Sequence, residues 1–335
     1  MLTLREKKYG KKVTSGKDFI LAIDVGGTNC NFGVFKKYKL LLSLHYKSAK
    51  VTDFSELVHW ALDHLWRKHK IKCNRICIAA AGPRKGNVIQ MTNRAWNVDA
   101  DKVSKKSRIK KVSLINDFEA IAYGIDVIDK KKLMQIKKGK AVKHGVRVLL
   151  GAGTGLGKSV LVYCQGYRSM ASEGGHGDYV ALGKEEKQLV EFIKKREKHD
   201  IIEWEDLLSG RGLVNIFLFM EKKYHKSKHR KLIAGVPDNI CNYKYKDKIA
   251  GKTFELFVKI YARCAKNFAL DVLATGGVYI AGGIAANHSS IFKKFGFEDE
   301  FVKSRKQESL LHDIPAFVIK DYNISLYGAA CCAQK

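Results

Sequence analysis

The stretch Leu114-Ile-Asn-Asp-Phe-Glu-Ala-Ile-Ala-Tyr-Gly124 decides how the rest of the chain is interpreted. It passes from a short β-branched strand, Val112 to Ile115, into an apolar helix, so Asn116 and Asp117 stand where the strand ends. Open α/β sheets bind their ligands at this edge. The amide of such a pair could bind one hydroxyl of a polyol while the carboxylate withdraws a proton from another. Either residue could instead serve only as the cap of the helix.

A glycine-rich hairpin is predicted near the N-terminus. Strands are expected at Phe19–Asp24 and Asn31–Phe35, and a tight turn joins them. Paired glycines let backbone amides approach a phosphate closely, polar side chains add donors, and an acid at the strand end can hold hydrated Mg²⁺. An ordinary Gly-Gly hairpin turn is the alternative. The residues predicted to contact the phosphates or Mg²⁺ are Asp24, Gly26, Gly27, Thr28 and Asn29.

A second hairpin with a similar pattern is predicted in the other half of the chain. The segment Val146-Arg-Val-Leu-Leu-Gly-Ala-Gly-Thr-Gly-Leu-Gly157 is a strand followed by a turn with four glycines, and Lys158 to Tyr163 forms the next strand. Two such hairpins, one in each half, indicate an internally duplicated pair of domains that closes on a nucleotide from both sides.

Further polar residues suit a ligand that carries several hydroxyls. Glu173 and His176 are three positions apart across two glycines, so both could face one ligand from a turn. The spacing leaves the role of Glu205 open, because it could also be a helix-terminus charge. The loop Met91–Trp96 could line a polyol pocket or serve in packing. The strand that starts at Val278 ends in two glycines, which lets the backbone lie close to an adenine or ribose.

Composition limits the remaining possibilities. The 335 residues allow two domains, and no apolar segment is long enough for a membrane span or a signal peptide, so an intracellular, cytoplasmic protein is expected. Residues 1–17 are interpreted as a disordered basic tail. The net charge of +29 is concentrated in lysine clusters with few aromatic residues or arginines. This pattern favours solvated faces over a nucleic-acid surface.

Cysteines and histidines give no metal-binding pattern in the sequence. The eight cysteines contain no CxxC pair, so buried, reduced thiols are expected. His59, His64 and His69 step by five along a predicted helix, which spreads them around it, and solvated or core histidines are therefore the prediction.

Eight motifs in register resemble the bacterial-type glucokinases of the hexokinase-like, actin-related ATPase superfamily. The resemblance covers residues 18 to 330, and the Cys-rich zinc motif of the related repressor and kinase family is absent. The motifs are Asp24-Val-Gly-Gly-Thr-Asn29, Met91-Thr-Asn-Arg-Ala-Trp96, Ile115-Asn-Asp-Phe118, Gly151-Ala-Gly-Thr-Gly-Leu-Gly157, Glu173-Gly-Gly-His176, Glu205 to Gly212, Gly277-Val-Tyr-Ile-Ala-Gly-Gly283 and His312-Asp-Ile-Pro315.

The resemblance implies an α/β fold of two RNase H-like (actin/hexokinase-type) domains with a cleft between them. The expected division is a small domain, 18–115 plus 320–335, and a large domain, 116–319. The resemblance also implies transfer of the γ-phosphoryl group of MgATP to the 6-hydroxyl of glucose, no bound metal besides the Mg²⁺ carried with ATP, and a homodimer.

The resemblance assigns roles to individual residues. Asp117 matches the catalytic base, and the nucleotide-binding positions of the first hairpin are those given above. The residues that match sugar ligands are Asn93, Asn116, Asp117, Glu173, His176 and Glu205. The further residues that match nucleotide-binding positions are Gly153, Thr154 and Gly155, with Gly282 and Gly283 near adenosine.

Overall fold

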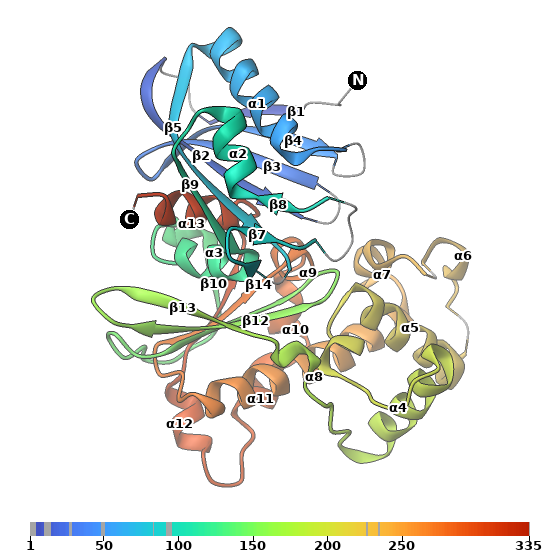
Figure 1. Ribbon diagram of the computed structural model, residues 1–335. Helices are drawn as coiled ribbons and strands as arrows, with labels where there is room; N and C mark the ends of the chain where they lie inside the picture. Colours follow the sequence, from blue (N-terminus) through green and yellow to red (C-terminus); the bar gives the residue numbers. More distant parts are fainter. Residues whose placement is uncertain are drawn as a thin grey trace. The chain divides into compact units, whose positions relative to one another are not determined.

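The computed structural model describes residues 5–9, 15–26, 29–47, 51–82, 84–91, 96–225, 227–233 and 235–334. The chain forms two compact units (Figure 1). Unit 1 comprises residues 1–129 together with 323–335, and unit 2 comprises residues 130–322. Both are α/β, which confirms the predicted fold class.

Unit 1 is built on a six-stranded mixed sheet in the order β1-β4-β3-β2-β5-β9. The β2–β3–β4 meander is antiparallel, whereas β5 and β9 run parallel to β2. A small three-stranded sheet, β6-β7-β8, accompanies it. The strands are β1 Arg5–Lys8, β2 Gly16–Val25, β3 Asn29–Lys36, β4 Lys39–Lys47, β5 Ile71–Ala80, β6 Arg84–Lys85, β7 Val88–Ile89, β8 Val98–Asp99 and β9 Lys111–Asn116.

Strand β2 is apolar on both faces because helices cover the sheet on both sides. Phe19, Leu21 and Ile23 belong to one buried cluster, together with residues of α1 and α2. Ile20 and Ala22 point the other way and join residues of α3 and α13. The sequence of a central strand that is buried on both faces is a continuous run of apolar residues. The helices of unit 1 are α1 Phe54–His69, α2 Ala100–Ser107, α3 Asp117–Gly124 and α13 Ile324–Cys332.

Unit 2 repeats the strand pattern of unit 1. Its sheet has the order β10-β15-β14-β11-β12-β13. Here β11, β12 and β13 form the antiparallel meander, and β14 and β15 are the parallel strands beside it. This correspondence is the internal duplication expected from the two hairpins. The strands are β10 Leu133–Lys137, β11 Arg147–Ala152, β12 Leu156–Tyr163, β13 Tyr167–Ser172, β14 Gly277–Ala281 and β15 Ala316–Ile319.

The helices of unit 2 share one large apolar core with its sheet. The long helix α8 contributes most of its apolar face to this core. The helical segments are η2 Lys130–Lys132, η3 Gly174–His176, α4 Gly183–Glu197, η4 Trp204–Asp206, α5 Gly210–Tyr224, α6 Arg230–Ile233, α7 Pro237–Tyr243, α8 Lys248–Asp271, α9 Gly283–Asn287, α10 Ser290–Lys294, α11 Phe297–Val302 and α12 Glu308–Asp313.

Two features of the observed division differ from the sequence prediction. The prediction of a disordered basic tail is wrong for Arg5–Lys8, which pairs antiparallel with β4. The first boundary lies after residue 129 instead of residue 115, and the second lies after residue 322 instead of residue 319. Helix α3 therefore belongs to unit 1, where Gly328 of α13 lets the two helix backbones meet closely.

Candidate functional site

Asn116 and Asp117 lie at the junction of β9 and α3, as the sequence predicts. The Oδ1 atom of Asn116 accepts a hydrogen bond from the amide of Phe118 at 2.8 Å, and Glu119 completes a capping box. Asn116 therefore caps the helix. Since capping uses only the oxygen, the Nδ2 group remains a donor suited to a sugar hydroxyl.

Asp117 is the first residue of α3 and is half-buried. Its Oδ1 atom accepts from the amide of Phe118 at 3.0 Å. The N-terminus of a helix favours a negative charge, because the unpaired amides and the helix dipole both stabilise it. The position therefore suits an ionised carboxylate, the form that a general base requires.

Asp24 ends a directed chain of side-chain hydrogen bonds in unit 1. Since the amide of Asn31 donates to Asp24, its oxygen must accept, and Nδ1 of His45 therefore carries a proton. Every member then donates toward the carboxylate. The bonds are Asn323–Tyr9 (3.4 Å), Tyr9–Ser43 (3.3 Å), Ser43–His45 (2.8 Å), His45–Asn31 (2.8 Å) and Asn31–Asp24 (3.3 Å).

Burial shifts the pKa of two residues in this series of hydrogen bonds. Burial raises the pKa of Asp24, although hydrogen bonds from Asn31 and Ser325 oppose the shift. Burial also lowers the pKa of His45, and the charges of Arg5 and Lys7 on β1 act in the same direction. A neutral His45 is the form that the directed chain requires.

A pH dependence of stability follows from His45. The unfolded state takes up a proton at this histidine below its usual pKa of about 6.5, whereas the native state resists protonation, so lowering the pH destabilises the fold. We expect His45→Gln to reduce the fall in thermal unfolding temperature between pH 7.5 and 5.5. His59→Gln, which alters an exposed histidine of α1, is the control. Identical pH dependence in wild type and the His45 variant would contradict this assignment.

The second predicted hairpin is formed by β11 and β12. Its turn closes through a hydrogen bond from the amide of Gly153 to the carbonyl of Gly155 at 2.8 Å. The carbonyl of Gly153 also accepts from the amide of Gly210, the first residue of α5. Thr154 is exposed at the tip, where its hydroxyl and the neighbouring amide are available to a phosphate.

Glu205 is held against this turn. Its Oε2 atom accepts from the amide of Leu156 at 2.9 Å. A Cβ atom on Gly155 would lie only 2.4 Å from the same oxygen, whereas a Cβ atom on Gly153 would meet nothing within 4 Å. The predicted phosphate turn and a predicted sugar ligand are therefore in direct contact within unit 2.

This contact predicts different effects for two similar substitutions. We expect Gly155→Ala to displace Glu205 and to raise the KM for glucose by roughly 10-fold, the cost of losing about one charge-assisted hydrogen bond. Gly153→Ala should change that KM by less than about twofold, because the site is open. Steady-state kinetics with saturating ATP test the pair. Equal effects of the two substitutions would mean that the Glu205 contact does not position a sugar ligand.

His176 ends the short turn η3, and Glu173 immediately precedes that turn. The amide of His176 donates to the carbonyl of Glu173 at 3.0 Å, and both side chains are exposed. The Nδ1 atom of His176 lies 2.7 Å from Glu203, and this hydrogen bond raises the pKa of His176. Sequence reasoning missed Glu203. Its position two residues before Glu205 is the signal that could have identified it.

Gly282 and Gly283 follow strand β14. Gly282 adopts a φ of 92°, and a Cβ atom there would lie 2.3 Å from the carbonyl oxygen of Ala152 on β11. A Cβ atom on Gly283 would meet no atom within 4 Å. Gly282 is therefore required by the close approach of two backbones, while Gly283 has room beside it for a flat ligand.

The remaining predicted positions are only partly described. In the first hairpin, the amide of Gly26 donates to the carbonyl of Asn29 at 2.9 Å. Gly27, Thr28 and Asn93 lie outside the residues that the structure describes.

The geometry agrees with a comparison of the sequence with known families. The family model for glucokinase matches residues 21–335. The glucokinase of Nostoc punctiforme is 31% identical over an alignment that covers 94% of this chain and 99% of that protein. This chain belongs to the glucokinase family. Its activity is that of the family, ATP-dependent phosphorylation of glucose.

Solved structures of glucokinases have the same fold. The glucokinase from an Antarctic psychrotroph superposes with a TM-score of 0.79 at 26% identity, covering 95% of this chain and 99% of that one. The glucokinase of Balamuthia mandrillaris, solved in complex with glucose, gives a TM-score of 0.80 at 24% identity, covering 95% and 94%. Both comparisons confirm the predicted hexokinase-like architecture of this glucokinase-family chain.

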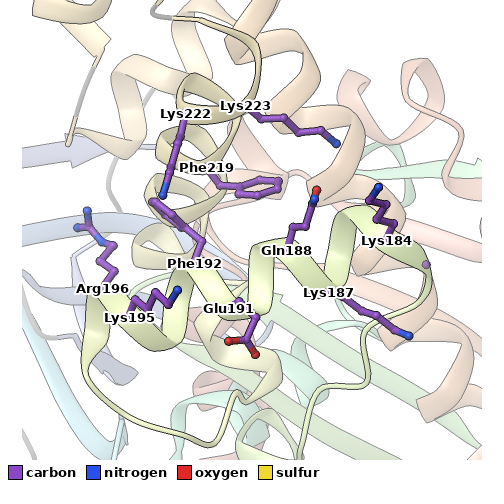
Figure 2. Close-up of a pocket in the computed structure, with 11 residues that line it drawn as sticks. Lys184, Lys187, Gln188, Glu191, Phe192, Lys195, Arg196, Phe219, Lys222 and Lys223 are labelled. Carbon is purple, nitrogen blue, oxygen red and sulfur yellow. The ribbon is translucent and has the colours of Figure 1, made fainter.

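Unit 2 also has a large groove. It has a volume of about 970 Å³ and runs between α4 and α5 (Figure 2). Phe192 and Phe219 pack against each other at 5.9 Å, and basic side chains surround them. Its lining contains none of the predicted glucose or nucleotide ligands.

The groove charges are predicted to be dispensable for phosphoryl transfer. We expect the double variant Lys187→Gln, Lys195→Gln to keep kcat/KM for glucose within about twofold, because no predicted ligand lines the groove and salt screens the field of exposed charges. The assay is run at physiological ionic strength. A loss of more than 10-fold in the folded variant would show that the groove takes part in the reaction.

In the part of the chain that the structure describes, no helix is long and apolar enough to cross a membrane.

Proposed function

We propose that Asp117 is the general base of glucose phosphorylation in this chain. Its carboxylate accepts the proton of the 6-hydroxyl while the hydroxyl oxygen bonds to the γ-phosphorus of ATP. The bond between the γ-phosphorus and the bridging oxygen breaks, and ADP leaves. The observation that carries the proposal is the position of this half-buried carboxylate at the exit of β9 and the N-terminus of α3.

Glucose recognition is assigned to the polar side chains that match sugar ligands by resemblance. In unit 1, Asn116 donates through the Nδ2 group that capping leaves unused, and Asn93 is a further ligand by resemblance. In unit 2, Glu173 and Glu205 accept from sugar hydroxyls. His176, which Glu203 orients, donates to the sugar. Such a set rejects sugars that lack the matching hydroxyls, because ligand groups that the bound sugar covers would remain unpaired.

The nucleotide is assigned to the glycine-rich turns. Backbone amides and the Thr154 hydroxyl can stabilise the charge that develops on the phosphoryl oxygens. Gly26 to Asn29 contribute from the first hairpin, Gly153 to Gly155 from the second, and Gly282 with Gly283 adjoin the adenosine. Asp24 offers the hard carboxylate oxygen that suits Mg²⁺ through a water molecule. Mg²⁺ bound with ATP neutralises phosphate charge.

A coupled assay of ADP release over a panel of hexoses tests the proposal. We expect glucose to give the highest kcat/KM, with dependence on both ATP and Mg²⁺. Activity with N-acetylmannosamine or fructose but not glucose would overturn the substrate assignment. The homodimer implied by resemblance stays a prediction, which sedimentation velocity can test.

A further inference from the structure

The structure brings together two histidines and a carboxylate that are far apart in the sequence. Glu6 lies on β1, whereas His64 and His69 lie on α1. The Nε2 atom of His64 is 3.0 Å from one carboxylate oxygen of Glu6, and that of His69 is 3.2 Å from the other. The possible ligand atoms of the three residues lie within 4.8 Å of one another. We propose that Glu6, His64 and His69 form a binding site for Zn²⁺.

The chemistry of these three side chains suits zinc. Imidazole nitrogen and carboxylate oxygen are common zinc ligands, and His₂Glu with a water molecule completes a tetrahedral set. Zn–N and Zn–O bonds of about 2.0–2.1 Å place neighbouring ligand atoms about 3.3 Å apart in a tetrahedron. Each imidazole nitrogen lies close to that distance from a different oxygen of Glu6, at 3.0 and 3.2 Å, so the carboxylate must turn for one oxygen to neighbour both nitrogens.

The surroundings hold the ligands in place. The side chains of Glu6, His64 and His69 are only 12%, 20% and 7% exposed. The ring of Trp60 stacks on that of His64, with centroids 6.1 Å apart. His69 is also the last residue of α1, where the helix dipole favours a cation. Strand β1 and helix α1 therefore hold the three side chains close together before a metal binds.

The same residues could form nothing more than an ion-pair cluster. Lys68 also contacts Glu6, at 3.0 Å. Its side chain is half exposed, so the ammonium group can move into water when a metal takes its place. Metal binding by the imidazole nitrogens separates the two interpretations, because an ion-pair cluster has no specific affinity for zinc.

One of the three proposed ligands lies outside the matched family region. The family model begins at residue 21, so Glu6 precedes it. Zinc bound here would cross-link β1 to α1 and protect the N-terminal strand without touching any residue assigned to glucose or ATP. The expected result is stabilisation by ligand binding, which increases with metal concentration.

Metal titration of the full-length protein tests the proposal. Metal-free protein is titrated with Zn²⁺ in competition with a chromophoric chelator, and Co²⁺ is used as a spectroscopic probe of the geometry. We expect one saturable site, and visible Co²⁺ absorption typical of tetrahedral coordination. The double variant His64→Gln, His69→Gln should bind at least 100-fold more weakly, since losing even an outer-shell partner costs about 10- to 100-fold. His59→Gln is the matched control on the same helix and should bind as wild type does.

A second variant and a second measurement cover the case in which the double variant misfolds. Glu6→Gln replaces one ligand oxygen by an amide on the N-terminal strand, and should also weaken zinc binding. Zn²⁺ should slow tryptic cleavage within Arg5–Lys8 in wild type but not in Glu6→Gln. No saturable binding in wild type, or equal affinity in wild type and the folded variants, would overturn the proposal.

Discussion

Replacing Asp117 by Asn is expected to reduce turnover by about 10²- to 10⁴-fold, the usual contribution of a general base. The amide has nearly the shape of the carboxylate and can still accept a hydrogen bond from Phe118, so α3 should begin at the same residue. What it lacks is a basic oxygen for the proton of the 6-hydroxyl. Glucose should therefore still bind, and the loss should appear in kcat at saturating glucose.

Two measurements separate this effect from a structural one. Glucose binding is followed by calorimetry in the absence of ATP, and turnover by ADP release. Asp126→Asn removes an exposed carboxylate shortly after α3 and is expected to leave both quantities near those of wild type. Near-normal turnover of the Asp117 variant would place the base elsewhere, with Glu173 as the first candidate. Complete loss of glucose binding would make Asp117 chiefly a ligand.

The repeating architecture was predictable because its signals are local. Apolar alternation and glycine pairs mark the two hairpins, and the structure pairs Ile20 with Phe35 in the first and Ala152 with Leu156 in the second. The Asn-Asp pair at a strand exit was equally visible in the sequence. Each of these features depends on neighbours within about twenty residues, so sequence pattern is sufficient to find them.

The features that sequence reasoning missed depend on contacts between distant segments. The helical spacing of His64 and His69 places them on different sides of a helix, and only the pairing of β1 with β4 brings Glu6 to both. The orientation of Asp24 likewise depends on Tyr9 and Asn323, which are 314 residues apart. No local sequence pattern predicts such contacts between distant residues.

The domain boundary is a further case of a long-range contact. The resemblance implied a division immediately before Asn116. The structure instead keeps α3 in unit 1, because it packs against α13 at the other end of the chain. Gly328 permits that packing, and its signal in the sequence is only a single glycine within an apolar helix.

A methyl group at Gly328 is expected to be strongly destabilising. The Cβ atom of Gly328→Ala would lie 1.6 Å from the carbonyl oxygen of Ala120 and 2.8 Å from the amide nitrogen of Gly124. Both atoms belong to the backbone of α3, so no side-chain rotation can relieve the overlap and the two helices must separate. Overpacking of this kind costs about 3 kcal/mol, at the upper end of the usual range. For a unit of this size, that lowers the unfolding temperature by about 10 °C.

The displacement of α3 should also lower turnover, because α3 begins with the proposed base, Asp117. A shift of about 1 Å in a positioned group can reduce turnover by roughly 10²-fold, so the folded fraction of Gly328→Ala should be nearly inactive. Gly251→Ala is the matched control within α8, where the new Cβ would meet only the carbonyl oxygen of Lys244, at 3.3 Å. Its helix gains the usual propensity of Ala over Gly, about 1 kcal/mol, which offsets a small local adjustment. Differential scanning calorimetry and ADP release on both variants test the prediction. If Gly328→Ala unfolded and turned over like Gly251→Ala, the close packing of α13 on α3 would not position Asp117.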